Sequence, residues 1–204
     1  MGMNKDHYFI SSYVHIRKSQ IYKNGKLLYK SEANTTVSSF LKESYKELPI
    51  NYPKFHKMDD LCKMGILSSS ILLMDEDYSD DTGLVLSNAS SSYNTDLKHQ
   101  QTIQAMVSPA VFVYTLPNIV LGEISIKFGL KSENAFFIEN EFNARLLYDY
   151  TSVLIDNNKA ESVVCGWIEV KNDEYDVFLC LVTKKGAIPF SIENLKKLYL
   201  FENE

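Results

Sequence analysis

The sequence has no long hydrophobic run, no excess of basic residues and no export signal, and each absence excludes a class of protein. No apolar stretch approaches the ~18 residues that a membrane span needs. The 21 Lys and Arg residues are outnumbered by 26 Asp and Glu residues, and they form no clustered patch of the kind that nucleic-acid-binding proteins carry. The N-terminus has no basic segment followed by an apolar stretch. We therefore expect a cytoplasmic protein that neither spans a membrane nor binds nucleic acid.

Cysteine is scarce as well, with only Cys62, Cys165 and Cys180 in 204 residues. An odd number without close spacing argues against a disulfide framework or a zinc site. Cys165 and Cys180 lie in the apolar runs VVCGW and FLCLV, which is typical of unreactive buried thiols. The four histidines are scattered, and the sequence contains no Gly-rich phosphate loop, no G-x-S-x-G and no H-E-x-x-H. We expect no metal and no cofactor.

The sequence does have the composition of a single globular α/β domain spanning residues 1–204. Apolar residues make up 45% and charged residues 23%, which is enough for a sizeable core. Short β-branched and aromatic runs alternate with stretches of helical periodicity, and this alternation predicts a mixed β-sheet layered with helices. The predicted strands are 8–16, 82–87, 135–138, 162–170 and 175–183, and the predicted helices are about 35–48, 58–74, 95 onward, 117–128, 141–157 and 192–198.

Turn and cap residues mark the ends of several of these elements. Asn24-Gly25 lies between two short strand-like runs and predicts a two-residue β-hairpin near the N-terminus. Asn172-Asp173 separates two strand-like runs, which favours an antiparallel pair. Asn34 or Thr35 is the expected N-cap of the helix at about 35–48, and Ser191 is a good N-cap for the last helix.

The most informative segment is SPAVFVYTLPNIVLGEISIKFGL, residues 108–130, in which Pro117 is predicted to lie in the first turn of a helix. The segment is similar to a stretch of β-ketoacyl-acyl-carrier-protein synthases, which have the thiolase fold. In that family a Ser-Pro-aromatic loop leads through an Asn into a helix and then into a Tyr/Phe-Gly-Leu turn. The matching residues here are Ser108, Pro109, Thr115, Asn118, Gly122, Ile124, Ile126, Phe128, Gly129 and Leu130.

The resemblance continues beyond this segment and covers about residues 54–169. In the family, the turn runs into a buried strand at the dimer interface, then to the nucleophilic Cys at the tip of a central helix, then to a Gly-rich strand. Here AFFI (135–138) takes the place of the interface strand, and SVVCGWIE (162–169) takes the place of the Gly-rich strand. Counting forward from Gly129 and backward from Gly166 reaches the same position, Glu141, where the family has its cysteine. The resemblance implies half of a thiolase-type fold with an added N-terminal hairpin.

This resemblance also implies that the chain has no ketosynthase activity of its own. A carboxylate at Glu141 cannot hold an acyl group as a thioester. The two catalytic histidines of the family belong to the C-terminal half of the fold, which we expect this chain to lack. The implied role is that of a chain-length-factor-like subunit. Such a subunit forms a heterodimer with an active ketosynthase and helps to elongate chains on an acyl carrier protein, as in aryl-polyene or flexirubin-type pigment pathways.

In such a heterodimer, strand 135–138 is expected to pair with the equivalent strand of the partner. Six residues are candidates to line the acyl tunnel or to lie at the interface. They are Phe112, Tyr114, Phe136, Phe137, Ile138 and Phe142. Packing in the core is the competing interpretation of each.

Glu141 has a second interpretation, and two other functions stay open. A carboxylate in the first turn of a helix is stabilised by the helix dipole by ~0.3–1 kcal/mol, and Asn140 is the expected N-cap of that helix. A homodimeric acyl-binding or structural protein would bury the apolar surface of the half-fold without any chemistry. A malonyl decarboxylase would use Glu141 itself.

Overall fold

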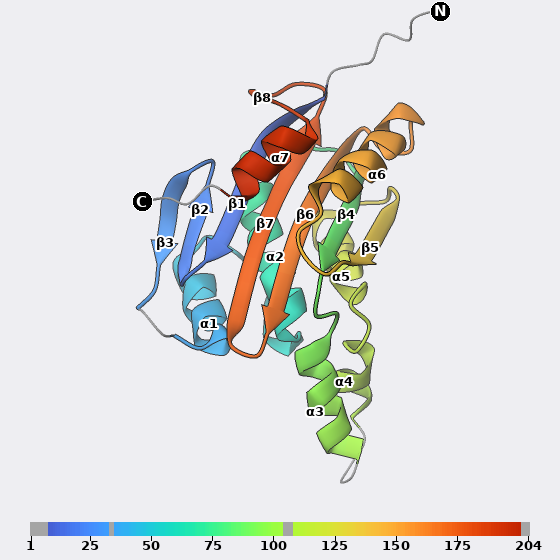
Figure 1. The fold of residues 1–204 in the computed structure, drawn as a ribbon. Helices are drawn as coiled ribbons and strands as arrows, with labels where there is room; N and C mark the ends of the chain where they lie inside the picture. The colour runs from blue at the N-terminus through green and yellow to red at the C-terminus, as the bar shows by residue number, and fades with distance from the viewer. Residues whose placement is uncertain (1–7, 33–34, 104–107, 201–204) are drawn as a thin grey trace, which may run out of the picture.

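The computed structural model describes residues 8–32, 35–103 and 108–200, which are built around one mixed eight-stranded β-sheet (Figure 1). The strand order is β3-β2-β1-β7-β6-β4-β5, and β8 pairs with β1. Strand β4 runs parallel to both β5 and β6, and the other pairs are antiparallel. The strands are β1 Phe9–Arg17, β2 Gln20–Lys23, β3 Lys26–Lys30, β4 Thr82–Asn88, β5 Asn134–Ile138, β6 Ser162–Lys171, β7 Glu174–Thr183 and β8 Ile188–Pro189.

Helices cover both faces of this sheet, which confirms the predicted layered α/β class (Figure 1). Helices α1, α2 and α5 contribute to the core on one face, and α6 and α7 to the core on the other. No helix within the described residues is both long enough and apolar enough to cross a membrane. The helices are α1 Val37–Glu47, α2 Asp60–Leu72, α3 Tyr93–Ile103, α4 Pro109–Val113, α5 Ile119–Phe128, α6 Ala144–Asp156 and α7 Ile192–Tyr199, with a 3₁₀ turn, η1, at Pro53–Lys57.

The central strands are apolar along their length because both faces are covered. On β6, Val164 and Ile168 point into the core beneath α2 and α5, whereas Val163 and Cys165 point into the core beneath α6. All seven residues of β4 are buried. This burial explains why these segments are continuous apolar runs in the sequence.

The two predicted tight turns are confirmed. Asn24 and Gly25 both have positive φ angles, 51° and 76°, as a type I′ hairpin between β2 and β3 requires. Asn172 has φ 54° and closes the antiparallel β6–β7 pair. Ser191 caps α7 as predicted, with its Oγ accepting a hydrogen bond from the Asn194 N–H at 3.1 Å.

Two predicted helix starts differ from the structure. Helix α1 is capped by Thr36, whose Oγ1 accepts from the Ser39 N–H at 3.3 Å, and not by Thr35. The other proposed cap, Asn34, lies outside the described residues. Helix α3 begins at Tyr93, two residues before its predicted start.

The segment 108–118 also differs from the prediction. Its first part forms the short helix α4, which the sequence pattern did not suggest, with the Ser108 Oγ accepting from the Val111 N–H and Pro109 in the first turn. Pro117 therefore lies in the connection between two helices, and α5 begins after Asn118. Pro117 thus precedes α5 and lies outside its first turn, where it was predicted.

Helices α2 and α5 approach closely where Gly65 faces Val120. A Cβ placed on Gly65 would lie 2.2 Å from the Val120 Cγ2 atom. A Cβ on Gly122, on the exposed side of α5, would have no atom within 4 Å. The two glycines thus offer a matched test of this packing.

We expect Gly65→Ala to lower the free energy of unfolding by roughly 1–2 kcal/mol, because α2 and α5 must move apart to accommodate the methyl group. Gly122→Ala should instead raise it by up to ~1 kcal/mol, because alanine favours the helix over the unfolded chain. Urea denaturation of both variants measures these changes. Equal effects at the two positions would contradict the close α2–α5 contact.

Candidate functional site

Glu141 lies in the loop between β5 and α6, and its side chain is exposed. The predicted position in the first helical turn, with Asn140 as the cap, is wrong. Helix α6 begins at Ala144, and the Oδ1 atom of Asn143 caps it by accepting from the Leu146 N–H at 3.0 Å. The Nδ2 group of Asn143 also donates to Glu139 at 2.8 Å. This bond connects the two ends of the loop, residues 139–143, which precedes α6. Stabilisation by the helix dipole therefore does not explain Glu141.

Phe142 turns inward from the same loop and packs against the C-terminal helix. Its ring stacks on Tyr199 of α7 with centroids 3.9 Å apart and planes 12° apart. It also meets Phe178 of β7 edge-on at 5.7 Å. These contacts within the chain fix the loop that carries Glu141.

The C-terminal end of α7 is in turn held by β1 and β7. The Arg17 guanidinium lies 4.5 Å above the Tyr199 ring, and its Nη1 group donates to the Tyr199 carbonyl at 2.7 Å. Arg17 also forms an ion pair with Asp176. The Tyr199 hydroxyl donates to the same carboxylate at 2.6 Å. Burial, followed by this hydrogen bond to Asp176, raises the pKa of Tyr199 above its ordinary range.

His15 of β1 also holds the end of α7, and we call His15, Arg17, Asp176 and Tyr199 together the α7 anchor. Its Nε2 group donates to the Leu198 carbonyl at 2.9 Å, and its ring lies 5.0 Å from that of Phe178. Cationic groups near a helix C-terminus, such as Arg17, interact favourably with its unpaired carbonyls. The sequence analysis missed these residues, since Arg17 and Asp176 are 159 positions apart and carry no shared pattern.

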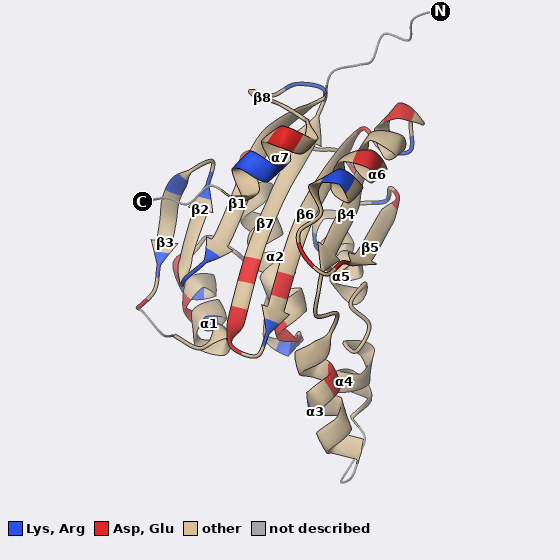
Figure 2. Ribbon diagram, in the orientation of Figure 1, with Lys and Arg blue, Asp and Glu red and all other residues tan. Residues whose placement is uncertain are grey.

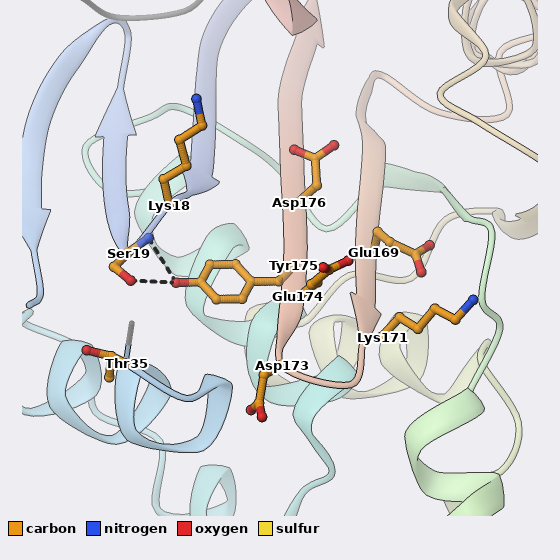
Figure 3. Close-up of a pocket in the computed structure, with 9 residues that line it drawn as sticks. All are labelled: Lys18, Ser19, Thr35, Glu169, Lys171, Asp173, Glu174, Tyr175 and Asp176. Atoms are coloured by element: carbon orange, nitrogen blue, oxygen red, sulfur yellow. Dashed lines mark hydrogen bonds between the residues drawn. The ribbon is translucent and has the colours of Figure 1, made fainter. Parts of the chain in front are cut away.

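A pocket of about 660 Å³ opens beside this anchor, between the β6–β7 hairpin and the end of β1 (Figure 3). Its carboxylates are largely engaged by the chain itself. Glu169 accepts from the Ala89 and Ser90 N–H groups, and Asp173 accepts from the Val37 N–H. The pocket is lined by Lys18, Ser19, Thr35, Glu169, Lys171, Asp173, Glu174, Tyr175 and Asp176. We assign it a structural role.

Strand β5 forms one edge of the sheet, and its burial differs from the prediction. The segment AFFI was expected to be buried, but Ala135, Phe136 and Phe137 are half-buried and Ile138 is 52% exposed. The reason is topological, because β5 pairs with β4 on one side only. Phe136 packs against the core beneath α5, whereas Phe137 packs against the core beneath α6 and meets Tyr150 edge-on at 5.1 Å.

Below β5, helices α3 and α4 project beyond the end of the sheet and form an arm, residues 93–103 and 108–118 (Figure 1). The sequence has no Asp, Glu, Lys or Arg in residues 99–122. Phe112 is 58% exposed and contacts the His99 ring at 5.4 Å. The exposed large apolar residues of the arm are Tyr93, Leu97, Ile103, Phe112, Val113 and Leu116. An apolar, uncharged projection of this kind is typical of a protein interface.

The other expected motif residues lie around the base of this arm. Asn118 holds the N-cap position of α5 without a side-chain cap bond, and Gly129 ends α5 in the left-handed conformation at φ 70°. Gly122 is exposed in the middle of α5, where glycine costs ~1 kcal/mol relative to alanine. Ile126, one turn further on, is 67% exposed.

A buried acid at the base of the arm was not predicted. Glu123 is 5% exposed and accepts a hydrogen bond from the Tyr114 hydroxyl at 3.2 Å. Its other oxygen lies 2.8 Å from the Lys54 Nζ atom. Burial, followed by the Glu123 charge, raises the pKa of Tyr114 above its ordinary range. The sequence did contain a sign of this buried acid, because Glu123 is the one charged residue in the apolar run IVLGEISI.

Cys165 and Cys180 are buried, as predicted, and Cys62 is buried as well. Cys62 lies in α2, and burial raises the pKa of its thiol. Cys165 and Cys180 face each other across β6 and β7 with Sγ atoms 3.4 Å apart. None of them lies in the loop at Glu141. Within the described ranges, no cluster of three His, Cys, Asp or Glu residues is arranged to hold a metal ion.

Burial of His15, followed by the nearby charge of Arg17, lowers its pKa from 6.5 to about 4. The unfolded chain therefore takes up a proton near pH 6.5 that the folded chain accepts only near pH 4. We expect the free energy of unfolding to fall by roughly 3 kcal/mol as the pH drops through this window. His15→Gln keeps a donor for the Leu198 carbonyl and should remove this component. Urea titrations at several pH values measure it, and exposed His56→Gln should behave as wild type.

Known protein structures share this fold, although the sequence matches no protein-family model and no curated protein. The ishigamide ketosynthase/chain length factor has a TM-score of 0.64 at 15% identity, over 87% of this chain and 62% of that chain. A ketosynthase in complex with its chain length factor from Xenorhabdus doucetiae gives a TM-score of 0.60 at 12% identity, over 95% of this chain and 90% of that chain. A β-ketoacyl synthase from Burkholderia phymatum gives 0.57 at 11% identity, over 94% and 60%.

These likenesses confirm the fold that the sequence motifs implied. The chain spans about three fifths of the first of these proteins but nearly the whole of the matched chain from the Xenorhabdus complex. At 11–15% identity the similarity concerns the fold. The chain has half of the thiolase-type fold that ketosynthases and chain length factors share.

Proposed function

We propose that residues 1–204 form one domain that acts as a non-catalytic, chain-length-factor-like subunit of a ketosynthase. It pairs with an active ketosynthase, and the pair elongates chains on an acyl carrier protein in an aryl-polyene or flexirubin-type pathway. The observation that carries this proposal is the exposed apolar edge of β5 next to an uncharged arm. Exposed apolar surface of this extent is typical of a site that binds another protein rather than a small substrate.

The loop at Glu141 supports the non-catalytic part of the proposal. The position that corresponds to the ketosynthase nucleophile carries an exposed carboxylate, and all three thiols of the chain are buried elsewhere. The neighbouring Phe142 is stacked on Tyr199, so α7 occupies the space beside this position. A condensing enzyme needs a thiolate and a general base at this point.

In this proposal β5, α5 and the arm form the surface that contacts the ketosynthase. In the proposed complex, β5 adds to the partner's equivalent strand, and Phe136, Phe137 and Ile138 meet the partner across the extended sheet. Phe112 projects from the arm toward the acyl tunnel, whereas Tyr114 packs against the core with its hydroxyl held by Glu123. Gly122 lies on the exposed side of α5, where its missing side chain permits close approach of the partner.

Co-expression with the ketosynthase encoded by a neighbouring gene tests the pairing. We expect a 1:1 complex by light scattering, and a change in product length when elongation on malonyl-carrier protein is assayed with and without this chain. Phe112→Asp should weaken the complex at least ~10-fold, because a central aromatic contact is lost. Leu27→Asp, an equally exposed apolar residue on the opposite edge strand β3, should have no effect.

Failure to form a complex, together with unchanged product length, would count against the proposal. If the isolated chain decarboxylates malonyl substrates and Glu141→Ala abolishes this activity, the chain is a malonyl decarboxylase instead. A stable homodimer of the chain alone would favour an acyl-binding or structural protein.

Restoring a thiol tests the assignment of Glu141. We expect Glu141→Cys in the isolated chain to give no condensation, because His15 is buried and its Nε2 group is bound to the Leu198 carbonyl. Product formation is measured on malonyl-carrier protein, with the active ketosynthase as the positive control. Elongation by Glu141→Cys alone would show that the chain carries a complete catalytic site.

A further inference from the structure

Two glutamates stand at the ends of the open β5 edge. Glu133 precedes the strand, and its carbonyl accepts from the Leu84 N–H at 3.1 Å. Glu139 follows the strand, and its N–H donates to the Asn88 carbonyl at 2.9 Å. Both residues thus extend the ladder with β4 by one position, so each carboxylate has a fixed place along the edge. Figure 2 shows acidic residues at both ends of β5.

No cation of the described residues neutralises these carboxylates. Among the residues that the structure describes, no Lys, Arg or His forms an ion pair with Glu133, Glu139 or Glu141. Lys131, the nearest cation to Glu133 along the sequence, is 2.8 Å from Asp80 instead, and Arg145, the nearest to Glu139 and Glu141, forms no ion pair with either of them. Glu139 accepts a hydrogen bond from the neutral amide of Asn143.

This arrangement has a definite consequence for pairing of the chain with a second copy of itself. A two-fold axis perpendicular to a continuous sheet makes the two β5 strands antiparallel, and directly opposed residues must point to the same face. The register that pairs all five residues of β5 places Phe136 opposite Phe136. It also places Glu133 of each copy opposite Glu139 of the other. Two like-charge pairs then oppose each other directly, which is destabilising in antiparallel sheets.

The two neighbouring registers pair fewer residues of β5, and one of them again opposes carboxylates. A shift that places Phe137 opposite Phe137 brings Glu133 of each copy opposite Glu141 of the other and pairs only three residues of β5. The shift in the other direction also pairs three residues and sets Glu133 against Phe137. The one register that pairs the whole strand therefore opposes carboxylates, and the register that avoids them pairs only three residues and places a charge against an aromatic ring.

We propose that the carboxylates flanking β5 exclude a second copy of this chain and select a different polypeptide. The selected partner presents an antiparallel edge strand with an apolar centre and Lys or Arg at the flanking positions. This inference rests on the proposed function and deepens it, because it specifies why the subunit forms a heterodimer. Complementary charge at the ends and apolar contact at the centre together set partner choice and register.

A charge exchange at one end of the strand tests this directly. Glu133→Lys turns both opposed pairs into opposite-charge pairs, so we expect this variant to dimerise. Its dissociation constant, measured by sedimentation velocity, should be at least ~10-fold below that of the wild-type chain. The double variant Glu133→Lys/Glu139→Lys restores like charges and should be monomeric alone. Mixed with wild type, it should form a mixed dimer, because every Glu then faces a Lys.

The matched control is Glu47→Lys on α1, which is exposed and changes the net charge equally but lies away from β5. It should sediment as wild type. Added salt should weaken the Glu133→Lys dimer, because it screens the new attractions. The proposal is overturned if the wild-type chain dimerises as tightly as Glu133→Lys, if Glu133→Lys stays monomeric, or if Glu47→Lys dimerises to the same extent.

The same variants separate this inference from the proposed function. We expect Glu133→Lys/Glu139→Lys to bind the ketosynthase at least ~10-fold more weakly than wild type does. If the wild-type chain binds no ketosynthase, the proposed function fails, while the sedimentation results still decide whether the carboxylates prevent self-pairing. If the ketosynthase binds both forms equally, charge selection of the partner is refuted although the pairing stands.

Discussion

The parallel pairing of β4 with β5 and β6 is the constraint on which the rest of this structure depends. Strand β4 is buried over all seven residues and hydrogen-bonds on both sides. Among the described residues β5 pairs with β4 alone, so β5 lies at the edge of the sheet with one side open. The same ladder sets the places of Glu133 and Glu139, which bond to β4 just beyond the strand ends. Both the apolar centre and the acidic ends of the candidate interface thus follow from one pairing.

The C-terminal helix α7 stabilises the loop between β5 and α6, on the face of the sheet that α6 and α7 cover. Arg17 and His15 hold the last carbonyls of α7, and Tyr199 then stacks on Phe142. The loop with Glu141 is consequently fixed by aromatic packing rather than by the start of α6. Glu141 is therefore exposed, while the aromatic residue after it packs into the core of this chain.

The two edge strands of the sheet, β3 and β5, carry their charged residues at different places. Strand β3, at one edge, carries exposed Lys26 and Lys30, and charged side chains of this kind discourage further strand addition. Strand β5, at the other edge, carries no charge within its five residues and is flanked by acids instead. Lysines along an edge reject any strand, whereas acids only at the ends leave the centre open to a strand of complementary charge. This difference is consistent with one closed edge and one edge reserved for a partner.

Local chemistry in the sequence determined the elements and much of the family likeness. Asn24-Gly25 requires a I′ turn whatever surrounds it, the apolar runs of β4 and β6 could only be buried strands, and the segment 108–130 carried its own motif. Tertiary structure alone decided the site. The half-burial of Phe136 depends on which strand lies beside β5, the role of Phe142 depends on Tyr199 57 positions later, and the start of α6 depends on the bond between Asn143 and Glu139. The sequence fixes what each residue prefers as its surroundings, but contacts between distant segments decide which of those preferences are met.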